Sequence, residues 1–242
     1  MTEPNPTFPA ADDVAPAAKP PVAKPHAHHV ESLGEEIANA ITHGIGTALS
    51  IAALAVLIAY AALADSASAI VGSAIYGATL IATYLSSTLY HSLLPGKPKR
   101  VFLALDHCGI FFLIAGTYTP ICFVGLPGWQ GWALFGVIWF LAVFGTALRL
   151  IWLRDMHAVI LGLYLVMGWI GAAFGGRLID QIGQAGVNLI ILGGVCYTGG
   201  LVFYAWRKLP YNHALWHASV LAGSILHFFA ILFYVLPIAA AT

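Results

Sequence analysis

Long apolar stretches separated by short charged segments run through most of this chain. Asp, Glu, Lys and Arg are absent between Glu36 and Asp65 and from the stretches 66–96, 107–148, 156–176, 181–206 and 209–242. A helix that crosses a bilayer needs about 20 predominantly apolar residues, so each stretch is long enough. The stretch 107–148 fits two crossings, because a turn-forming segment at 126–131 (LPGWQG) interrupts it. The pattern therefore predicts an all-α bundle of seven transmembrane helices.

Composition supports this interpretation. Charged residues make up 8% of the chain, hydrophobic residues 60%, and the mean hydropathy is +0.86. A soluble domain of this size cannot bury so much apolar surface in one core. We expect an integral, multi-pass protein of the cell membrane. The formal net charge is zero, and no basic patch points to nucleic acid as a partner.

The distribution of Lys and Arg predicts the orientation. With seven spans numbered in order, the loops after the second, fourth and sixth spans contain seven basic residues: Lys97, Lys99, Arg100, Arg149, Arg154, Arg207 and Lys208. The loops on the opposite side contain only Arg177. Since cytoplasmic loops are enriched in basic residues, we expect a cytoplasmic amino terminus and an extracytoplasmic carboxyl terminus.

The amino-terminal segment has a different composition. Seven of its first twenty-five residues are proline, and no apolar run occurs there. Residues 1–31 are predicted to be a disordered cytoplasmic tail, in which a histidine tract at 26–29 is expected to be solvated rather than metal-bound. Ser32 and Glu35 have capping-box spacing and predict the start of the first helix, and hence of a membrane domain at 32–242.

Histidines provide the candidate chemistry. His91 ends the second predicted span, while His213 and His217 open the seventh and share one helix face, because they are four residues apart. All three are expected near the cytoplasmic face, as is Asp106 at the start of the third span. Three imidazoles can hold one metal ion and leave a position for water. Zinc fits best, although copper, iron and nickel also accept imidazole. Alternatively, Asp106 pairs with Arg100 or Lys99.

Several short segments form a pattern by their order and spacing. They are 87–91 (STLYH), 106–110 (DHCGI), 115–120 (AGTYTP) and 213–217 (HALWH), followed by Gly223 and 227–229 (HFF) and preceded by Asn39 and 42–44 (THG). This pattern resembles the hemolysin III family, the bacterial branch of the progestin and adipoQ receptor superfamily. The resemblance covers roughly residues 35 to 240.

The resemblance implies a site in detail. In adiponectin-receptor relatives, three histidines that correspond to His91, His213 and His217 hold a zinc ion. Asp106 matches the aspartate that holds the zinc-bound water, and Ser87 matches a serine whose hydroxyl could stabilise an oxyanion. For Ser87, a packing serine bonded to its own helix is the alternative. Alkaline ceramidases of the wider superfamily hydrolyse a lipid amide with this constellation.

Three further polar residues fall near the predicted site. Asn39 and His43 in the first span are expected to support the ligands or to pack beside them. His227 lies ten residues beyond His217, which is about 15 Å along a helix, so it cannot share the same ion. It is expected either to line a substrate cavity or to be a core histidine with satisfied hydrogen bonds.

Three functions are compatible with these features. The first is a zinc-dependent hydrolase acting on an amide or ester of an acyl lipid, with Asp106 as general base. The second is a membrane-homeostasis or sensor protein in which the zinc is structural. The third, suggested by the family name, is a pore-forming cytolysin; it ranks last, because an aqueous pore needs polar residues through the whole depth of several spans. The expected partner is a membrane lipid, as substrate or cavity ligand, and no protein partner is identifiable.

Overall fold

The structure is a computed structural model that describes residues 31–151 and 156–240. Throughout these residues the regular structure is helical, which confirms the predicted all-α class. The long helices are α1 (Leu33–Leu63), α2 (Ala67–Ser92), α3 (Lys97–Pro120), α4 (Trp129–Ile151), α5 (His157–Trp169), α6 (Gly175–Ala205) and α7 (Asn212–Ala230). A 3-10 segment, η3 (Ile170–Phe174), follows α5. The π-helical segment η2 (Ile121–Gly125) extends α3. The π-helical segment η4 (Ile231–Val235) extends α7 and leads into the short helix α8 (Leu236–Ala239).

The first helix starts where the capping-box spacing predicts. The Ser32 backbone N–H donates to Glu35 Oε2 at 2.8 Å, and the Glu35 backbone N–H donates to Ser32 Oγ at 3.3 Å. These reciprocal bonds satisfy amide groups that have no partner inside the helix. The predicted tail and its histidine tract lie almost wholly outside the described residues and stay predictions.

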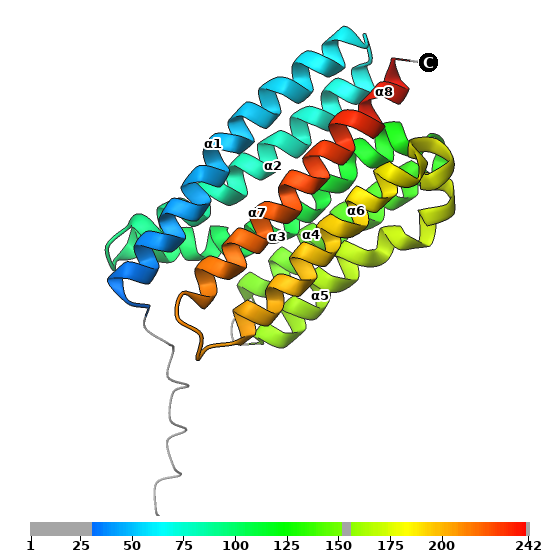
Figure 1. Ribbon diagram of the computed structural model, residues 1–242. Helices are drawn as coiled ribbons and strands as arrows, with labels where there is room; N and C mark the ends of the chain where they lie inside the picture. The colour runs from blue at the N-terminus through cyan, green and yellow to red at the C-terminus, as the bar shows by residue number, and fades with distance from the viewer. Residues whose placement is uncertain (1–30, 152–155, 241–242) are drawn as a thin grey trace, which may run out of the picture. The chain divides into compact units, whose positions relative to one another are not determined.

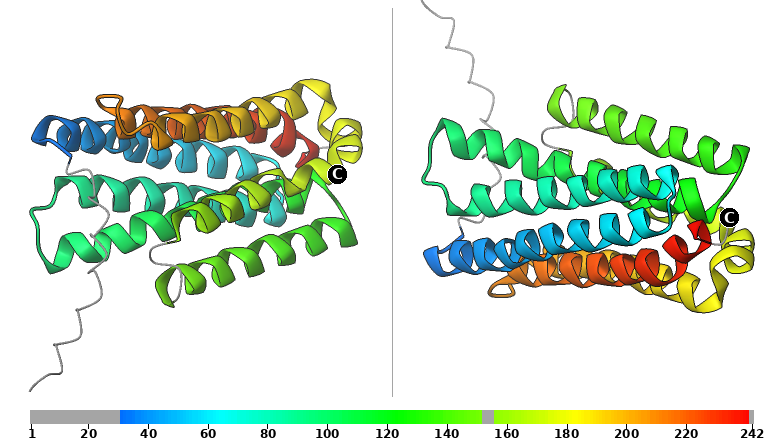
Figure 2. Two further views of the ribbon diagram at one scale, coloured as in Figure 1. Left: turned by 90° about the horizontal axis from the view of Figure 1, so that it is seen from below. Right: turned by 90° about the horizontal axis from the view of Figure 1, so that it is seen from above.

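The helices pack as a bundle in which α1, α2 and α7 lie side by side (Figure 1). Helix α2 also packs on α3, and α6 packs on α7. Figure 2 shows α4 and α5 on the other side of the bundle from α1. The α2–α3 and α6–α7 connections and the start of α1 lie at one end. This end, which carries Lys97, Lys99, Arg100, Arg207 and Lys208, is called the basic end below.

Within residues 31–151 and 156–240, six helical segments are long and apolar enough to cross a membrane. The fifth, Ala158–Ala205, has 48 residues and contains a non-helical break at Gly183, with φ 69° and ψ 165°. The indole N–H of Trp169 donates to Thr198 Oγ1 at 3.0 Å, so residues on either side of the break lie together. The chain thus folds back within this segment. The predicted count of seven crossings stays a prediction.

Most of the buried side chains are apolar, and Leu57, Phe111, Ile138 and Met167 are completely buried. Many large apolar side chains are exposed on the outside of the bundle, as expected for helices surrounded by lipid. A polar contact crosses the interior at Ser224 of α7. Its Oγ lies 2.7 Å from the hydroxyl oxygens of both Tyr84 and Tyr197, which joins α7 to α2 and α6.

Candidate metal centre

Three imidazoles from two helices meet at the basic end. His91 lies in the last turn of α2, and His213 and His217 lie in the first two turns of α7. The ring centroid of His91 is 5.2 Å from that of His213 and 5.1 Å from that of His217, and the α7 pair is 4.5 Å apart. One ligand nitrogen from each ring lies within 4.8 Å of the other two. The structure therefore brings together the three histidines that the sequence singles out, as a group that could hold a metal ion.

Local structure at the start of α7 positions two of these rings. Tyr211 adopts a left-handed conformation, with φ 57°, just before the helix begins. The side-chain amide of Asn212 donates to the carbonyl oxygen of Phe203 at 3.1 Å, which ties this start to the end of α6. From that fixed start, helical spacing places His213 and His217 on the same face.

Two carboxylates contact the Nδ1 atoms of two of these rings. Glu31 precedes α1, and Glu36 lies in the first turn of α1. Glu36 Oε2 lies 2.7 Å from His91 Nδ1, and Glu31 Oε1 lies 3.2 Å from His213 Nδ1. A carboxylate accepts the N–H of such an imidazole, which leaves Nε2 of His91 free to bind a metal and fixes the orientation of the ring. The sequence analysis missed both residues. Their signal is weak: three acidic residues within six positions at the start of a helix.

Burial and missing hydrogen bonds show that the donor set fits a cation. His91 is 5% exposed and His217 2% exposed. His91 Nε2 and His217 Nδ1 are buried without a hydrogen-bond partner among the described residues. A buried polar atom without a partner costs free energy, so nitrogens arranged in this way favour a bound ion or water. Zinc accepts three imidazoles and an open position, and these three rings supply nitrogens close enough together for one ion.

Asn39 and His43, on α1, both lie at this group. Asn39 is fully buried, and its side-chain Nδ2 donates a hydrogen bond to Glu31 Oε2 at 2.8 Å. The same Nδ2 lies 3.5 Å from His91 Nδ1. The ring of His43 stacks on His217 with centroids 3.5 Å apart. Their positions are those of residues that support the candidate ligands.

Asp106 lies farther from the three rings. Helix α3 begins at Lys97, so Asp106 is in its third turn rather than at its start. Its carboxylate lies within electrostatic range of Tyr90 and His91 of α2 and of Tyr204 of α6, so it faces the bundle interior. It is not among the groups whose ligand atoms all lie within 4.8 Å in the described part of the chain.

The predicted alternative for Asp106, an ion pair with Arg100 or Lys99, does not form between described residues. Lys99 Nζ instead donates to Glu36 Oε1 at 2.7 Å. Glu36 therefore bridges α3 to the histidine group. Ser87 lies one turn before His91 on the same face of α2; it is fully buried, and its Oγ has no hydrogen-bond partner among the described residues.

His227 belongs to a different part of the bundle. Its Nε2 lies 3.0 Å from the carbonyl oxygen of Ile190, and its ring packs directly against Gly193 of α6. The two predictions for this residue were a cavity-lining histidine and a satisfied core histidine. Its Nε2 has a partner on α6, whereas its Nδ1 is buried without a hydrogen-bond partner among the described residues, so both alternatives stay predictions.

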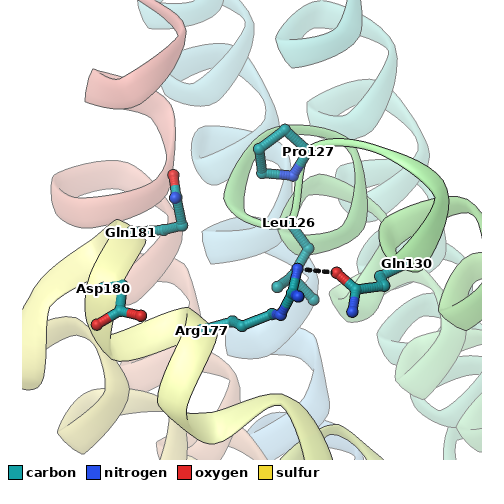
Figure 3. A pocket seen from close by; sticks show the side chains of 6 residues that line it. All are labelled: Leu126, Pro127, Gln130, Arg177, Asp180 and Gln181. Carbon is teal, nitrogen blue, oxygen red and sulfur yellow. Dashed lines mark hydrogen bonds between the residues drawn. The ribbon is translucent and has the colours of Figure 1, made fainter.

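A cavity of about 370 Å³ lies at the end of the bundle opposite the histidines. It is lined by residues of the α3–α4 turn and of α6, and Figure 3 shows Arg177 reaching across to Gln130, to which it donates a hydrogen bond. Asp180 and Gln181 complete its polar lining. It contains neither a histidine nor a cysteine, so it does not resemble the metal centre.

Comparisons with known proteins match most of this chain to one family. Residues 32–228 match the family described as Haemolysin-III related. Hemolysin-3 of Bacillus cereus is 45% identical over 206 residues, which cover 85% of this chain and 94% of that protein. The Hemolysin-3 homolog of Bacillus subtilis (strain 168) is 43% identical over 203 residues, or 84% and 95% of the two chains.

A more distant relative lies outside bacteria. Monocyte to macrophage differentiation factor of Homo sapiens is 28% identical over 160 residues, which cover 63% of this chain and 65% of that protein. This match supports the wider progestin and adipoQ receptor superfamily. Together with the family match and the apolar helices, it establishes that this multi-pass membrane protein belongs to the haemolysin III family.

Proposed function

We propose that this protein is a zinc-dependent hydrolase that cleaves an amide or ester bond of an acyl lipid at the basic end of the bundle. The observation that carries the proposal is the group of His91, His213 and His217. Glu36 contacts Nδ1 of His91, and Glu31 contacts Nδ1 of His213. A catalytic zinc site uses three protein ligands and an exchangeable position. Structural zinc sites more often have four protein ligands.

The three histidines would hold the ion, and bound zinc would supply Lewis acidity that polarises a lipid carbonyl and acidifies a neighbouring water. Glu36 and Glu31 keep His91 and His213 in the orientation and tautomer that a ligand needs. Asp106, facing the interior, accepts the proton of the attacking water and returns it to the leaving amine or alcohol. The buried hydroxyl of Ser87 donates a hydrogen bond to the carbonyl oxygen as negative charge develops there.

The position of the site favours a lipid substrate. Its ligands lie on helices long and apolar enough to cross a membrane, so the reacting bond must reach them from within or beside the bilayer. Acyl lipids place an amide or ester near the interface and a hydrocarbon chain in the apolar interior. The resemblance to a superfamily that includes alkaline ceramidases points to the same substrate class.

Metal removal tests this function. Protein purified in detergent or reconstituted in bilayers is expected to release fatty acid from a ceramide-like or ester lipid, to lose this activity when zinc is chelated, and to regain it when zinc is restored. Release would be measured by mass spectrometry over a panel of acyl lipids. A protein with full zinc occupancy that hydrolyses none of the panel contradicts the hydrolase proposal.

A structural metal in a membrane-homeostasis or sensor protein is the second proposal. Two observations favour it. The histidine group joins α2 to α7, and Glu36 of α1 contacts it; Asp106 is not within 4.8 Å of all the ligand atoms. In this case zinc would stabilise the bundle without turnover. The relatives named Hemolysin-3 suggest cytolysis, but the largely apolar core of the described residues gives little support to a water-filled pore.

We also propose that the bundle crosses the membrane seven times, with the segment Ala158–Ala205 crossing twice around the break at Gly183. A straight helix of 48 residues would be about 72 Å long, more than twice the thickness of the hydrocarbon core. Together with the basic residues at the histidine end, seven crossings would support a cytoplasmic amino terminus and an extracytoplasmic carboxyl terminus.

Reporter fusions test this topology. Alkaline phosphatase fused after Thr242 is expected to be active, and the same enzyme inserted next to Lys97 is expected to be inactive, because it folds only outside the cytoplasm. Green fluorescent protein at the same two positions should give the opposite pattern. Two fusion points that report the same side would contradict seven crossings, since an odd number of spans separates Lys97 from Thr242.

A further inference from the structure

An apolar groove lies between α3 and α4 at the basic end. Its volume is about 620 Å³, and its lining includes Ala104, Cys108 and Phe112 of α3 and Thr146 of α4. It opens to the outside of the bundle, where Leu105 and Leu150 are 48% and 41% exposed. An open apolar groove on the lipid-facing side of a membrane protein is occupied by hydrocarbon, since water would leave the apolar walls unfavourably solvated.

The mouth of the groove is positively charged. Lys97 and Arg100, in the first turn of α3, line it and are exposed. No salt bridge joins either of them to another described residue, whereas the neighbouring Lys99 is bound to Glu36. The amino terminus of α3 adds a partial positive charge, because Gly96 provides no side-chain cap for its backbone N–H groups. Two cations and a helix terminus therefore face the interface without an acidic partner among the described residues.

The length of the groove suits an acyl chain. From Val101 to Phe112 the lining of α3 extends over twelve residues, or about 16 Å along the helix axis. This path starts next to the cationic mouth and runs toward the membrane interior. The groove is thus charged where a lipid headgroup lies and apolar where its tail lies.

We propose that the α3–α4 groove is a binding site for an anionic phospholipid. Its headgroup phosphate binds Lys97, Arg100 and the amino terminus of α3, and one acyl chain lies along α3 from Val101 to Phe112. Basic pockets between transmembrane helices are suited to such headgroups. Thr146, the one uncharged polar side chain that lines the groove, has a buried Oγ1 without a partner among the described residues.

This site is separate from the histidine group. Asp106 lies two residues from both Ala104 and Cys108, and two residues along a helix correspond to a rotation of about 200°. The carboxylate therefore faces the side of α3 opposite the groove. Lipid binding here does not depend on zinc or on turnover, so it can be tested whether or not the hydrolase proposal holds.

Charge removal provides the first test. The full chain would be placed in nanodiscs of phosphatidylcholine containing increasing fractions of phosphatidylglycerol, and bound lipid would be measured by native mass spectrometry. The Lys97→Gln, Arg100→Gln variant is expected to lose on the order of tenfold in its preference for phosphatidylglycerol. The matched control, Arg207→Gln, Lys208→Gln, removes the same charge at the same end from the α6–α7 connection and should retain the preference. An unchanged preference in the first variant, or an equal loss in both, overturns the proposal.

Filling the groove provides the second test. Ala104→Phe places a large side chain inside it, whereas Ala133→Phe adds the same side chain to an exposed face of α4. Only the first should reduce bound phosphatidylglycerol, with both variants retaining the melting temperature of the wild type. If glycerol 3-phosphate competes as well as the intact lipid, or if Ala104→Phe folds and binds lipid normally, the groove does not hold an acyl chain and the proposal fails.

Discussion

Replacing both His213 and His217 with alanine is expected to remove nearly all zinc from the purified protein, from about one ion per chain to almost none. The reason is geometric, since His91 alone would remain of three imidazoles whose ligand nitrogens lie within 4.8 Å. A single imidazole cannot hold zinc against a chelator. The metal would be measured by elemental analysis after dialysis. Because the ion ties α2 to α7, the melting temperature should fall as well.

Graded and control variants make this result specific. Glu36→Gln keeps all three ligands but weakens the acceptor 2.7 Å from His91 Nδ1, so zinc affinity should fall about 10- to 100-fold without being abolished. His227→Ala removes a histidine that contacts Ile190 of α6, and it should keep its zinc. Full zinc content in the double histidine variant would show that the zinc binds at a site other than the histidine group.

The helical fold could be predicted from the sequence because charge-free stretches of sufficient length have few alternatives in a membrane. A backbone surrounded by lipid must satisfy its own hydrogen bonds, and a helix does so within one segment. The start of α1 was predictable for a local reason, since the bonds between Ser32 and Glu35 involve residues three positions apart. The division of the helical segment Ala158–Ala205 was also predictable, because Arg177 and Asp180 separate its two charge-free stretches and the non-helical break at Gly183 lies three residues beyond Asp180.

The candidate site could be predicted in part. His213 and His217 share a face by helical spacing alone, and the end of α2 brings His91 to the same depth. The contacts of Glu31 and Glu36 could not be predicted, because they depend on how α1 lies against α2 and α7. For the same reason the sequence left open an ion pair between Lys99 and Asp106, whereas the structure brings Lys99 of α3 within 2.7 Å of Glu36 of α1. Contacts within a helix follow from spacing, and contacts between helices require the tertiary structure.

Asp106→Asn is expected to abolish hydrolysis while leaving zinc content and melting temperature close to those of the wild type. Asparagine has nearly the same shape and can still accept a hydrogen bond, but it cannot take a proton from water. Loss of a general base typically lowers the rate about 10²- to 10⁴-fold, which exceeds any change that a small loss of stability would produce. Fatty acid release from the best lipid of the panel would be measured alongside elemental analysis of the same preparation.

The control for this variant is Asp180→Asn, which makes the same change in an exposed aspartate at the opposite end of the bundle and should leave the rate unchanged. The two proposals for the metal then give different results. In a hydrolase, the Asp106→Asn variant keeps its zinc but loses turnover. The reason is that Asp106 faces the interior near His91 but does not belong to the group of ligand atoms. In a structural metal protein, Asp106→Asn changes neither the zinc content nor any rate, since there is no turnover to lose. Retained hydrolysis in a zinc-loaded Asp106→Asn variant would remove this residue from the proposed chemistry and leave Ser87, or a base outside the described residues, to take its place.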